Sequence, residues 1–146
     1  MLSDYIVIDV EPDGQEHPRT LWVEGAKFIN GEKVEDFYSF NFSMLGKDTL
    51  PSFIFVQEVM TFIKDFPCLC YSQSYSKSLL EFELSSYNLD GFINYIGIED
   101  VASERMHQQL SFPELVSKFD LSPNHDGYFY SHVQNIHSIY EILKLL

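Results

Sequence analysis

The sequence predicts an α/β protein with one five-stranded mixed sheet, in which three antiparallel strands precede two parallel strands and helices cover both faces. Residues 1–42 contain three runs rich in β-branched and aromatic residues, which is typical of strands joined by turns. Beyond them, short apolar runs alternate with stretches whose apolar residues recur every three or four positions, as in helices. A length of 146 residues and a hydrophobic content of 45% suffice for the core of a single domain, 1–146.

The first three strands are predicted to form an antiparallel meander. The opening stretch, residues 5–14, begins as an apolar run and ends in the turn signal Pro-Asp-Gly. A polar loop separates it from a second strand at Thr20–Ile29. Asn30-Gly31 is a strong two-residue hairpin signal, so the third strand, residues 33–42, should pair with the second.

Helices and two further strands are expected after this meander. In order, they are a helix that begins at Pro51 and Ser52 and ends before Pro67, a strand at 67–71, a helix at 75–87, a strand at 92–100, a helix at 112–119 and a last helix at 130–146. Because helices connect them, the first, fourth and fifth strands should run parallel to one another.

The charge of the chain is strongly negative, since 9 Lys and Arg residues stand against 22 Asp and Glu residues for a net charge of −13. The basic residues are dispersed, whereas nucleic-acid binders usually cluster them against phosphates. Any nucleic-acid contact must therefore use a local patch, a bound metal or a more basic partner protein. The acidic surplus is equally consistent with an ordinary solvated surface.

Cellular location is expected to be cytoplasmic. The N-terminus has no basic region or long apolar core typical of a signal peptide, and no run approaches the length of a membrane span. Cys68 and Cys70 face the same way on one predicted strand, which disfavours a disulfide, so free buried thiols in a reducing compartment are expected. A Cys-x-Cys metal site would lack further nearby ligands.

The opening strand carries two acidic residues, Asp9 and Glu11, on one face. Two carboxylates at the end of an apolar strand are costly unless a cation lies between them, and Mg²⁺ or Mn²⁺ prefers such oxygen ligands. Alternatively, Glu11 lies in the following turn and Asp9 caps a neighbouring backbone group.

The segment Asp9-Val10-Glu11-Pro12-Asp13-Gly14, with the hairpin and the order of elements, resembles the first motif of the DEDD-type (DEDDh-like) 3'-5' exonuclease family. The resemblance implies a ribonuclease-H-like fold over essentially the whole chain. It also implies hydrolysis of phosphodiesters with two divalent cations, four carboxylates that hold them, and a histidine near the C-terminal helix as general base.

The remaining motifs depart from the family pattern. His132 matches the general-base histidine, so Asp9, Glu11 and His132 are the catalytic candidates, with Asp9 and Glu11 as metal ligands. Ser76 stands where the second aspartate is expected, and Ser72 stands where an Asn is usual. His137, five residues after His132, replaces the last aspartate. Without the resemblance, His132 would be a surface or cap residue and His137 an exposed helix residue.

The loss of two carboxylates should weaken cation binding severely, because even about 3 kcal/mol per ligand is roughly a hundredfold each. Asp126, Asp100 or Asp90 could substitute for a missing carboxylate if the chain brings one of them near. Tyr71 and Tyr75 could stack on bases, although aromatic residues more commonly fill a core.

Three functions follow from these observations. The first is a divergent metal-dependent nuclease that acts at nucleic-acid 3' ends, with Mg²⁺ or Mn²⁺ weakly bound. The second is a pseudo-exonuclease that retains the fold, needs no metal, and binds a protein partner or a nucleic-acid end without cutting. The third is an acidic mimic of nucleic acid that occupies the groove of a basic protein.

Overall fold

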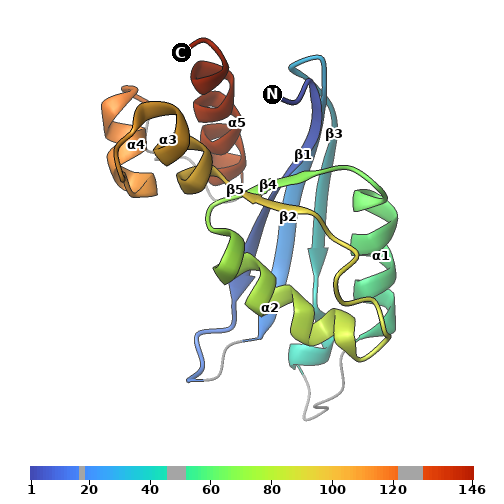
Figure 1. Cartoon of the computed structure of the whole chain (residues 1–146). Helices are drawn as coiled ribbons and strands as arrows, with labels where there is room; N and C mark the ends of the chain where they lie inside the picture. Colours follow the sequence, from blue (N-terminus) through green and yellow to red (C-terminus); the bar gives the residue numbers. More distant parts are fainter. Residues whose placement is uncertain (17–18, 46–51, 122–129) are drawn as a thin grey trace.

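The structure, a computed structural model, describes residues 1–16, 19–45, 52–121 and 130–146. Its five strands form one mixed sheet in the order β3-β2-β1-β4-β5 (Figure 1). The strands are β1 (Asp4–Pro12), β2 (Thr20–Ile29), β3 (Glu32–Phe40), β4 (Cys68–Cys70) and β5 (Tyr95–Gly97). β1, β2 and β3 pair antiparallel, whereas β4 runs parallel to β1 and β5 runs parallel to β4. The predicted fold class is confirmed.

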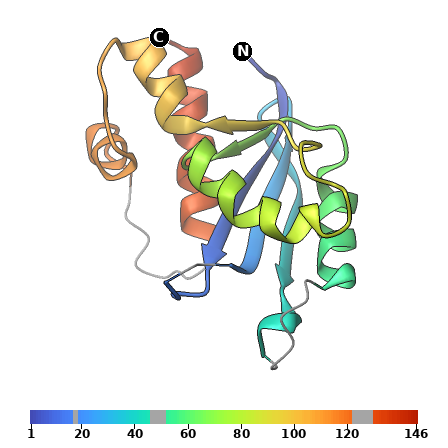
Figure 2. The same ribbon diagram turned by 60° about the horizontal axis from the view of Figure 1, so that its bottom comes forward.

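Within the described residues, five α-helices and a short 3₁₀ helix connect and cover the strands. They are η1 (Phe42–Leu45), α1 (Phe53–Ile63), α2 (Gln73–Ser85), α3 (Ile98–Met106), α4 (Phe112–Lys118) and α5 (Tyr130–Lys144). α1 and α2 pack on one face of the sheet, and α3, α4 and α5 pack on the other (Figure 2). None of the helices in the described ranges combines the length and the apolar character that a membrane crossing requires.

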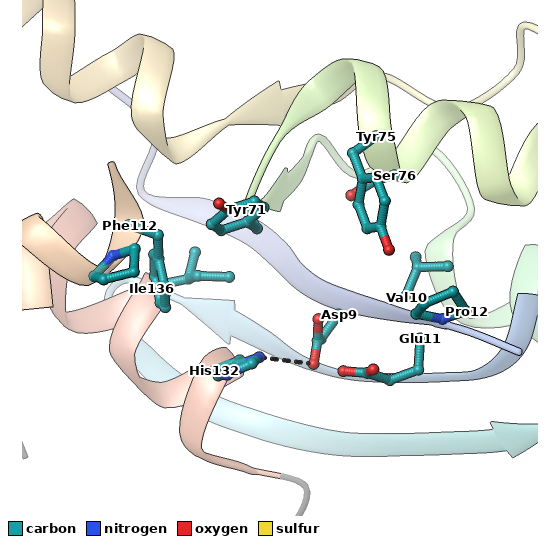
Figure 3. Close-up of a pocket in the computed structure, with 11 residues that line it drawn as sticks. Asp9, Val10, Glu11, Pro12, Tyr71, Tyr75, Ser76, Phe112, His132 and Ile136 are labelled. Carbon is teal, nitrogen blue, oxygen red and sulfur yellow. Dashed lines mark ion pairs between the residues drawn. The ribbon is translucent and has the colours of Figure 1, made fainter. Parts of the chain in front are cut away.

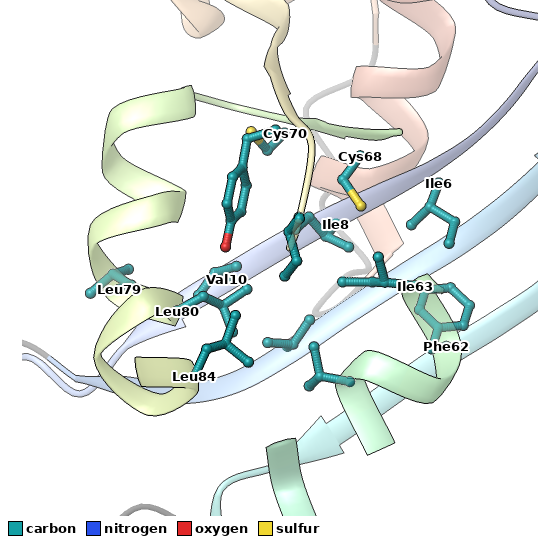
Figure 4. Close-up of a cluster of buried hydrophobic side chains, with 14 of the residues drawn as sticks. Ile6, Ile8, Val10, Phe62, Ile63, Cys68, Cys70, Leu79, Leu80 and Leu84 are labelled. Atoms are coloured by element: carbon teal, nitrogen blue, oxygen red, sulfur yellow. The ribbon is translucent and has the colours of Figure 1, made fainter. Parts of the chain in front are cut away.

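The two faces of β1 each organise a separate core. Alternate residues of the strand point to opposite sides, so Ile6, Ile8 and Val10 pack against α1 and α2 (Figure 4). Tyr5 and Val7 point the other way, into the layer of α3, α4 and α5. Because β1 is central to the sheet and buried on both sides, it should hold the side chains near its C-terminal end in fixed positions.

Two local predictions are confirmed. Asn30 and Gly31 have φ values of 51° and 81°, as a tight hairpin turn between β2 and β3 requires. Cys68 and Cys70 are free, and both are buried.

The predicted fifth strand, residues 92–100, is wrong in its extent. Only Tyr95–Gly97 forms β5, and α3 begins at Ile98, a helix that the sequence did not predict. The alternating apolar residues before residue 100 suggested a continuous strand, but Gly97 caps a helix with Glu99 and Asp100 in its first turn, where acidic side chains are favourable. Smaller differences concern β3, which ends at Phe40 rather than residue 42, and α2, which begins at Gln73 rather than residue 75.

Candidate functional site

The two acidic residues of β1 point into the layer that contains α5. Glu11 pairs with Trp22 of β2 and Asp9 pairs with Glu24, so both lie within the strand ladder. The alternative that places Glu11 in a turn is therefore wrong, because β1 continues to Pro12. Asp9 is only 9% exposed, and Glu11 is half-buried.

His132 approaches these carboxylates from the first turn of α5. Its Nδ1 atom lies 3.3 Å from Oδ2 of Asp9 (Figure 3). The buried residues Val133 and Ile136 fix the helix against the sheet, and the edge of the Phe112 ring contacts the imidazole at a centroid distance of 5.8 Å. The predicted neighbours Asp9, Glu11 and His132 thus meet in space although the sequence separates them widely.

The electrostatics of these three side chains are strongly linked. Burial raises the pKa of Glu11 to about 7, and the negative charge of Asp9 adds to this effect. Burial also opposes ionisation of Asp9, but its hydrogen bond with His132 and the imidazolium charge outweigh burial and lower the pKa of Asp9. The same hydrogen bond raises the pKa of His132. The ionised form of Asp9 is thus stabilised by the imidazolium of His132.

Glu24 is a functional candidate that the sequence did not predict. It lies directly opposite Asp9 on β2 and is 2% exposed. Burial, together with a hydrogen bond to Asp9, raises the pKa of Glu24 to about 9. Its Oε2 atom has no hydrogen-bond partner among the residues that the structure describes. The only sequence signal was an acidic residue inside an apolar strand, and the register that places it opposite Asp9 could not be inferred.

A cavity of about 310 Å³ opens beside the carboxylates. Its polar lining comes from Asp9, Glu11, Ser76 and His132, and its apolar lining comes from Val10, Pro12, Tyr71, Tyr75, Phe112, Pro113 and Ile136. Tyr71 and Tyr75 are 37% and 43% exposed, and the Tyr71 ring also packs on Phe112 at a centroid distance of 5.4 Å. Figure 3 shows both tyrosines across the cavity from the carboxylates. Phe112 and Pro113, at the start of α4, are lining residues that sequence reasoning missed.

The two serines that the sequence analysis assigned to the second motif, Ser72 and Ser76, have different surroundings. Ser76 is 3% exposed, lines the cavity with Asp9 and Glu11, and hydrogen-bonds Cys70. Ser72 instead caps α2, where its hydroxyl accepts a hydrogen bond from the backbone N–H of Tyr75. The position of Ser72 is explained by helix capping.

His137 does not join the group around Asp9. Its Nδ1 atom lies 2.7 Å from the hydroxyl of Tyr5, and its ring stacks on Phe28 at a centroid distance of 3.8 Å. The Tyr5 hydroxyl also donates a hydrogen bond to Glu141. The imidazole of His137 is therefore packed against aromatic residues of β1 and β2.

The candidate substitute carboxylates do not join the group around Asp9 either, as far as the structure describes them. Asp100 lies in the first turn of α3 rather than at the end of a strand, where it lines a different hollow with Glu99 and Glu114. Asp90 is exposed in the turn after α2. Asp126 lies outside the described residues.

The residues of the site fit one cation better than two. Within the described ranges, the one group of acidic, histidine or cysteine residues whose possible ligand atoms all lie within 4.8 Å of one another is Asp9, Glu11 and His132. A two-cation site needs carboxylates on both sides of ions that are roughly 4 Å apart. Ser76 offers only a neutral hydroxyl there, and His137 contacts Tyr5 instead.

No protein-family model and no curated protein matches this sequence, so the comparison with known proteins rests on three-dimensional structure. A 3'-exonuclease solved in a study of 3'-end specific recognition of a histone mRNA stem-loop superposes with a TM-score of 0.72 and 12% identity, over 97% of this chain and 64% of that one. The chain therefore spans less than two thirds of that exonuclease chain.

Two further structures give the same result. The nuclease domain of 3'hExo, a DEDDh family member bound to rAMP, has a TM-score of 0.70 and 13% identity, over 98% of this chain and 92% of that one. A product-bound exonuclease I has a TM-score of 0.72 and 9% identity, over 99% of this chain and 44% of that one. This chain therefore has the ribonuclease-H-like fold of the DEDDh 3'-exonucleases and of exonuclease I.

Proposed function

We propose that this chain is a divergent 3'-5' exonuclease-like domain that holds a nucleic-acid 3' end in the cavity beside Asp9, with phosphodiester hydrolysis impaired or absent. The observation that carries the proposal is the meeting of Asp9, Glu11 and His132 at the edge of a cavity with exposed aromatic walls. The fold relatives include enzymes solved with rAMP or with product, which is consistent with a nucleotide in this region.

Each part of the cavity has a defined task in this proposal. Asp9 and Glu11 would hold a divalent cation such as Mn²⁺ or Mg²⁺, which would bring positive charge to a phosphate and lower the pKa of a bound water. The rings of Tyr71 and Tyr75 would stack on the terminal bases, which needs no specific sequence. Among the residues that the structure describes, neither Lys nor Arg lines the cavity, so phosphate binding should depend on the cation.

Weak or absent hydrolysis follows from the ligands that the chain lacks. Ser76 contributes no charge at the second motif, and the imidazole of His137 packs on Phe28. Cleavage with two carboxylates missing should be slower by at least about a hundredfold than in a complete site.

The test uses a fluorescent single-stranded oligonucleotide, followed by anisotropy for binding and by gel for shortening from the 3' end. We expect binding that requires Mn²⁺, disappears in EDTA and is lost in Asp9→Asn, with little or no shortening. Glu104→Gln removes an exposed negative charge on α3 and serves as the matched control, which should bind as the wild type does. Equal binding in EDTA, or rapid shortening of the oligonucleotide, would contradict the proposal.

A second candidate function is a protein-binding module for a basic partner, which the net charge of −13 favours. The same titration separates the two functions. A basic-partner module should not bind the oligonucleotide with or without Mn²⁺, because the acidic surface repels polyanions.

A further inference from the structure

The ligand atoms of Asp9, Glu11 and His132 have the spacing of a single coordination sphere. They all lie within 4.8 Å of one another, and Nδ1 of His132 is 3.3 Å from Oδ2 of Asp9. Around one ion with bonds of about 2.1 Å, neighbouring ligand atoms are about 3 Å apart and opposite ones about 4.2 Å apart. The Asp9–His132 separation falls in this range, and the upper limit of 4.8 Å for the others exceeds it by about 0.6 Å, so small side-chain rotations would bring all three atoms onto one ion.

His132 contacts Asp9 directly, with no space for a water molecule between Nδ1 and Oδ2. A general base needs only hydrogen-bond reach of the proton it takes, whereas a metal ligand must lie beside the other ligands of the ion. The direct contact instead places the imidazole beside Asp9, where both side chains can face one ion. Packing of the ring against Phe112 and burial of Ile136 hold α5 in this position.

We infer that Asp9, Glu11 and His132 form a mononuclear site for a first-row transition-metal ion, in which the imidazole of His132 is a metal ligand. The inference rests on the cation site of the proposed function and specifies its metal. Instead of two cations with oxygen ligands, the site would hold one ion with two carboxylate ligands and one nitrogen ligand.

The choice of metal follows from the type of ligands. Mg²⁺ favours oxygen ligands and retains several waters, whereas imidazole suits Zn²⁺, Co²⁺ and Ni²⁺. Metal binding would displace the proton that His132 shares with Asp9, and two carboxylates with one neutral imidazole then balance the charge of one divalent ion. The site should therefore prefer Co²⁺ and Zn²⁺ to Mg²⁺, with Mn²⁺ between them, as the usual order of affinities predicts.

The experiment titrates metal-free protein with Co²⁺, Zn²⁺, Mn²⁺ and Mg²⁺ by calorimetry and records the visible spectrum of bound Co²⁺. We expect one ion per chain, with Co²⁺ and Zn²⁺ bound at least about tenfold more tightly than Mg²⁺. His132→Gln should weaken Co²⁺ and Zn²⁺ by at least about tenfold and change the Co²⁺ spectrum, while Mg²⁺ binding stays nearly constant.

Two further variants and one spectroscopic measurement test whether the ion binds at this site. Gln134→Ala changes an exposed residue on the same helix and should leave every affinity unchanged. The Asp9→Asn, Glu11→Gln double variant should abolish binding of one Co²⁺ per chain. Pulsed EPR of Mn²⁺ bound to the wild type should detect coupling to a ligand ¹⁴N, which tests the role of His132 without a substitution.

Two results would overturn the inference. One is Mg²⁺ affinity equal to that of Zn²⁺ together with no effect of His132→Gln, and the other is binding of two ions per chain. In either case the proposed function survives if Mg²⁺ still supports oligonucleotide binding. Conversely, a protein that binds Co²⁺ through His132 but never binds the oligonucleotide would refute the proposed function and leave the metal site established.

Discussion

Glu24 lies directly opposite Asp9 across the antiparallel ladder of β1 and β2, and the two carboxyl groups share a hydrogen bond. Glu24 is 2% exposed and lies behind Asp9, the residue that would face the cation. Because two neighbouring buried carboxylates cannot both ionise readily, the proton stays on Glu24 and the charge stays on Asp9. The acidic cluster thus carries fewer negative charges than its number of carboxyl groups suggests.

The protonation of Glu24 should make the fold less stable as the pH rises. The folded-state pKa of Glu24 is about 9, above its ordinary value of 4.5. Between these values the folded state holds a proton that the unfolded state has lost, so the free energy of unfolding falls with pH by at most about 1.4 kcal/mol per pH unit.

Glu24→Gln cannot titrate and still offers a hydrogen-bond donor to Asp9. Urea unfolding at pH 5, 7 and 8.5 should therefore show a flatter pH dependence in this variant and a higher stability than the wild type at pH 8.5. An unchanged slope would mean that Glu24 is ionised in the folded protein.

The ion pair between Arg19 and Glu83 should be critical for stability. Glu83 is fully buried, and both of its carboxylate oxygens accept hydrogen bonds from Arg19, at 3.1 Å and 3.0 Å. Arg19→Ala leaves a buried carboxylate without its cation, and we expect a loss of about 3–5 kcal/mol in the free energy of unfolding.

The matched control for Arg19→Ala is Lys33→Ala, which removes an exposed ion pair with Asp36. Surface ion pairs contribute little, so this variant should change stability by no more than about 1 kcal/mol. Equal effects of the two substitutions in chemical denaturation would show that the Arg19 pair is not buried in solution.

Tyr75 is expected to contribute to nucleic-acid binding rather than to stability. Its ring is 43% exposed and lines the cavity. Tyr75→Ala should weaken oligonucleotide binding by about 1–3 kcal/mol, as loss of one stacked base does, while the melting temperature changes little. Phe92→Ala, at an aromatic residue with 66% exposure outside the cavity lining, is the control and should bind normally in the same anisotropy assay.

Ser76→Asp should place a third carboxylate in the cavity beside Asp9 and Glu11. Ser76 is 3% exposed and lines the cavity with Asp9 and Glu11, so a third carboxylate there would be desolvated and repelled when no metal is present. We expect a lower melting temperature in EDTA and a larger increase on adding Mg²⁺ than in the wild type.

Ser78→Asp adds the same charge at an exposed position of α2 and should respond to Mg²⁺ as the wild type does. If Ser76→Asp and Ser78→Asp gave identical metal responses, position 76 would not lie in the cation site. The comparison therefore tests the position of the second motif independently of hydrolysis.

Local sequence patterns determined the main elements of this fold. The apolar run of β1, the Asn30-Gly31 turn and the helical periodicity of α1 and α5 each depend on neighbours a few residues apart, which the sequence displays directly. The alternation along β1 likewise placed Asp9 and Glu11 on one face. The same patterns failed at residues 92–100, where the capping position Gly97 converts a predicted strand into α3.

Only the tertiary structure decided what surrounds the two carboxylates. The register between β1 and β2 places Glu24 opposite Asp9, and the packing of α5 turns His132 toward Asp9 and His137 toward Tyr5. These contacts join residues far apart in the chain, and they depend on how helices and strands pack together rather than on any local pattern. The sequence by itself therefore determined the acidic strand, and the packing of the whole chain decided which side chains complete its site.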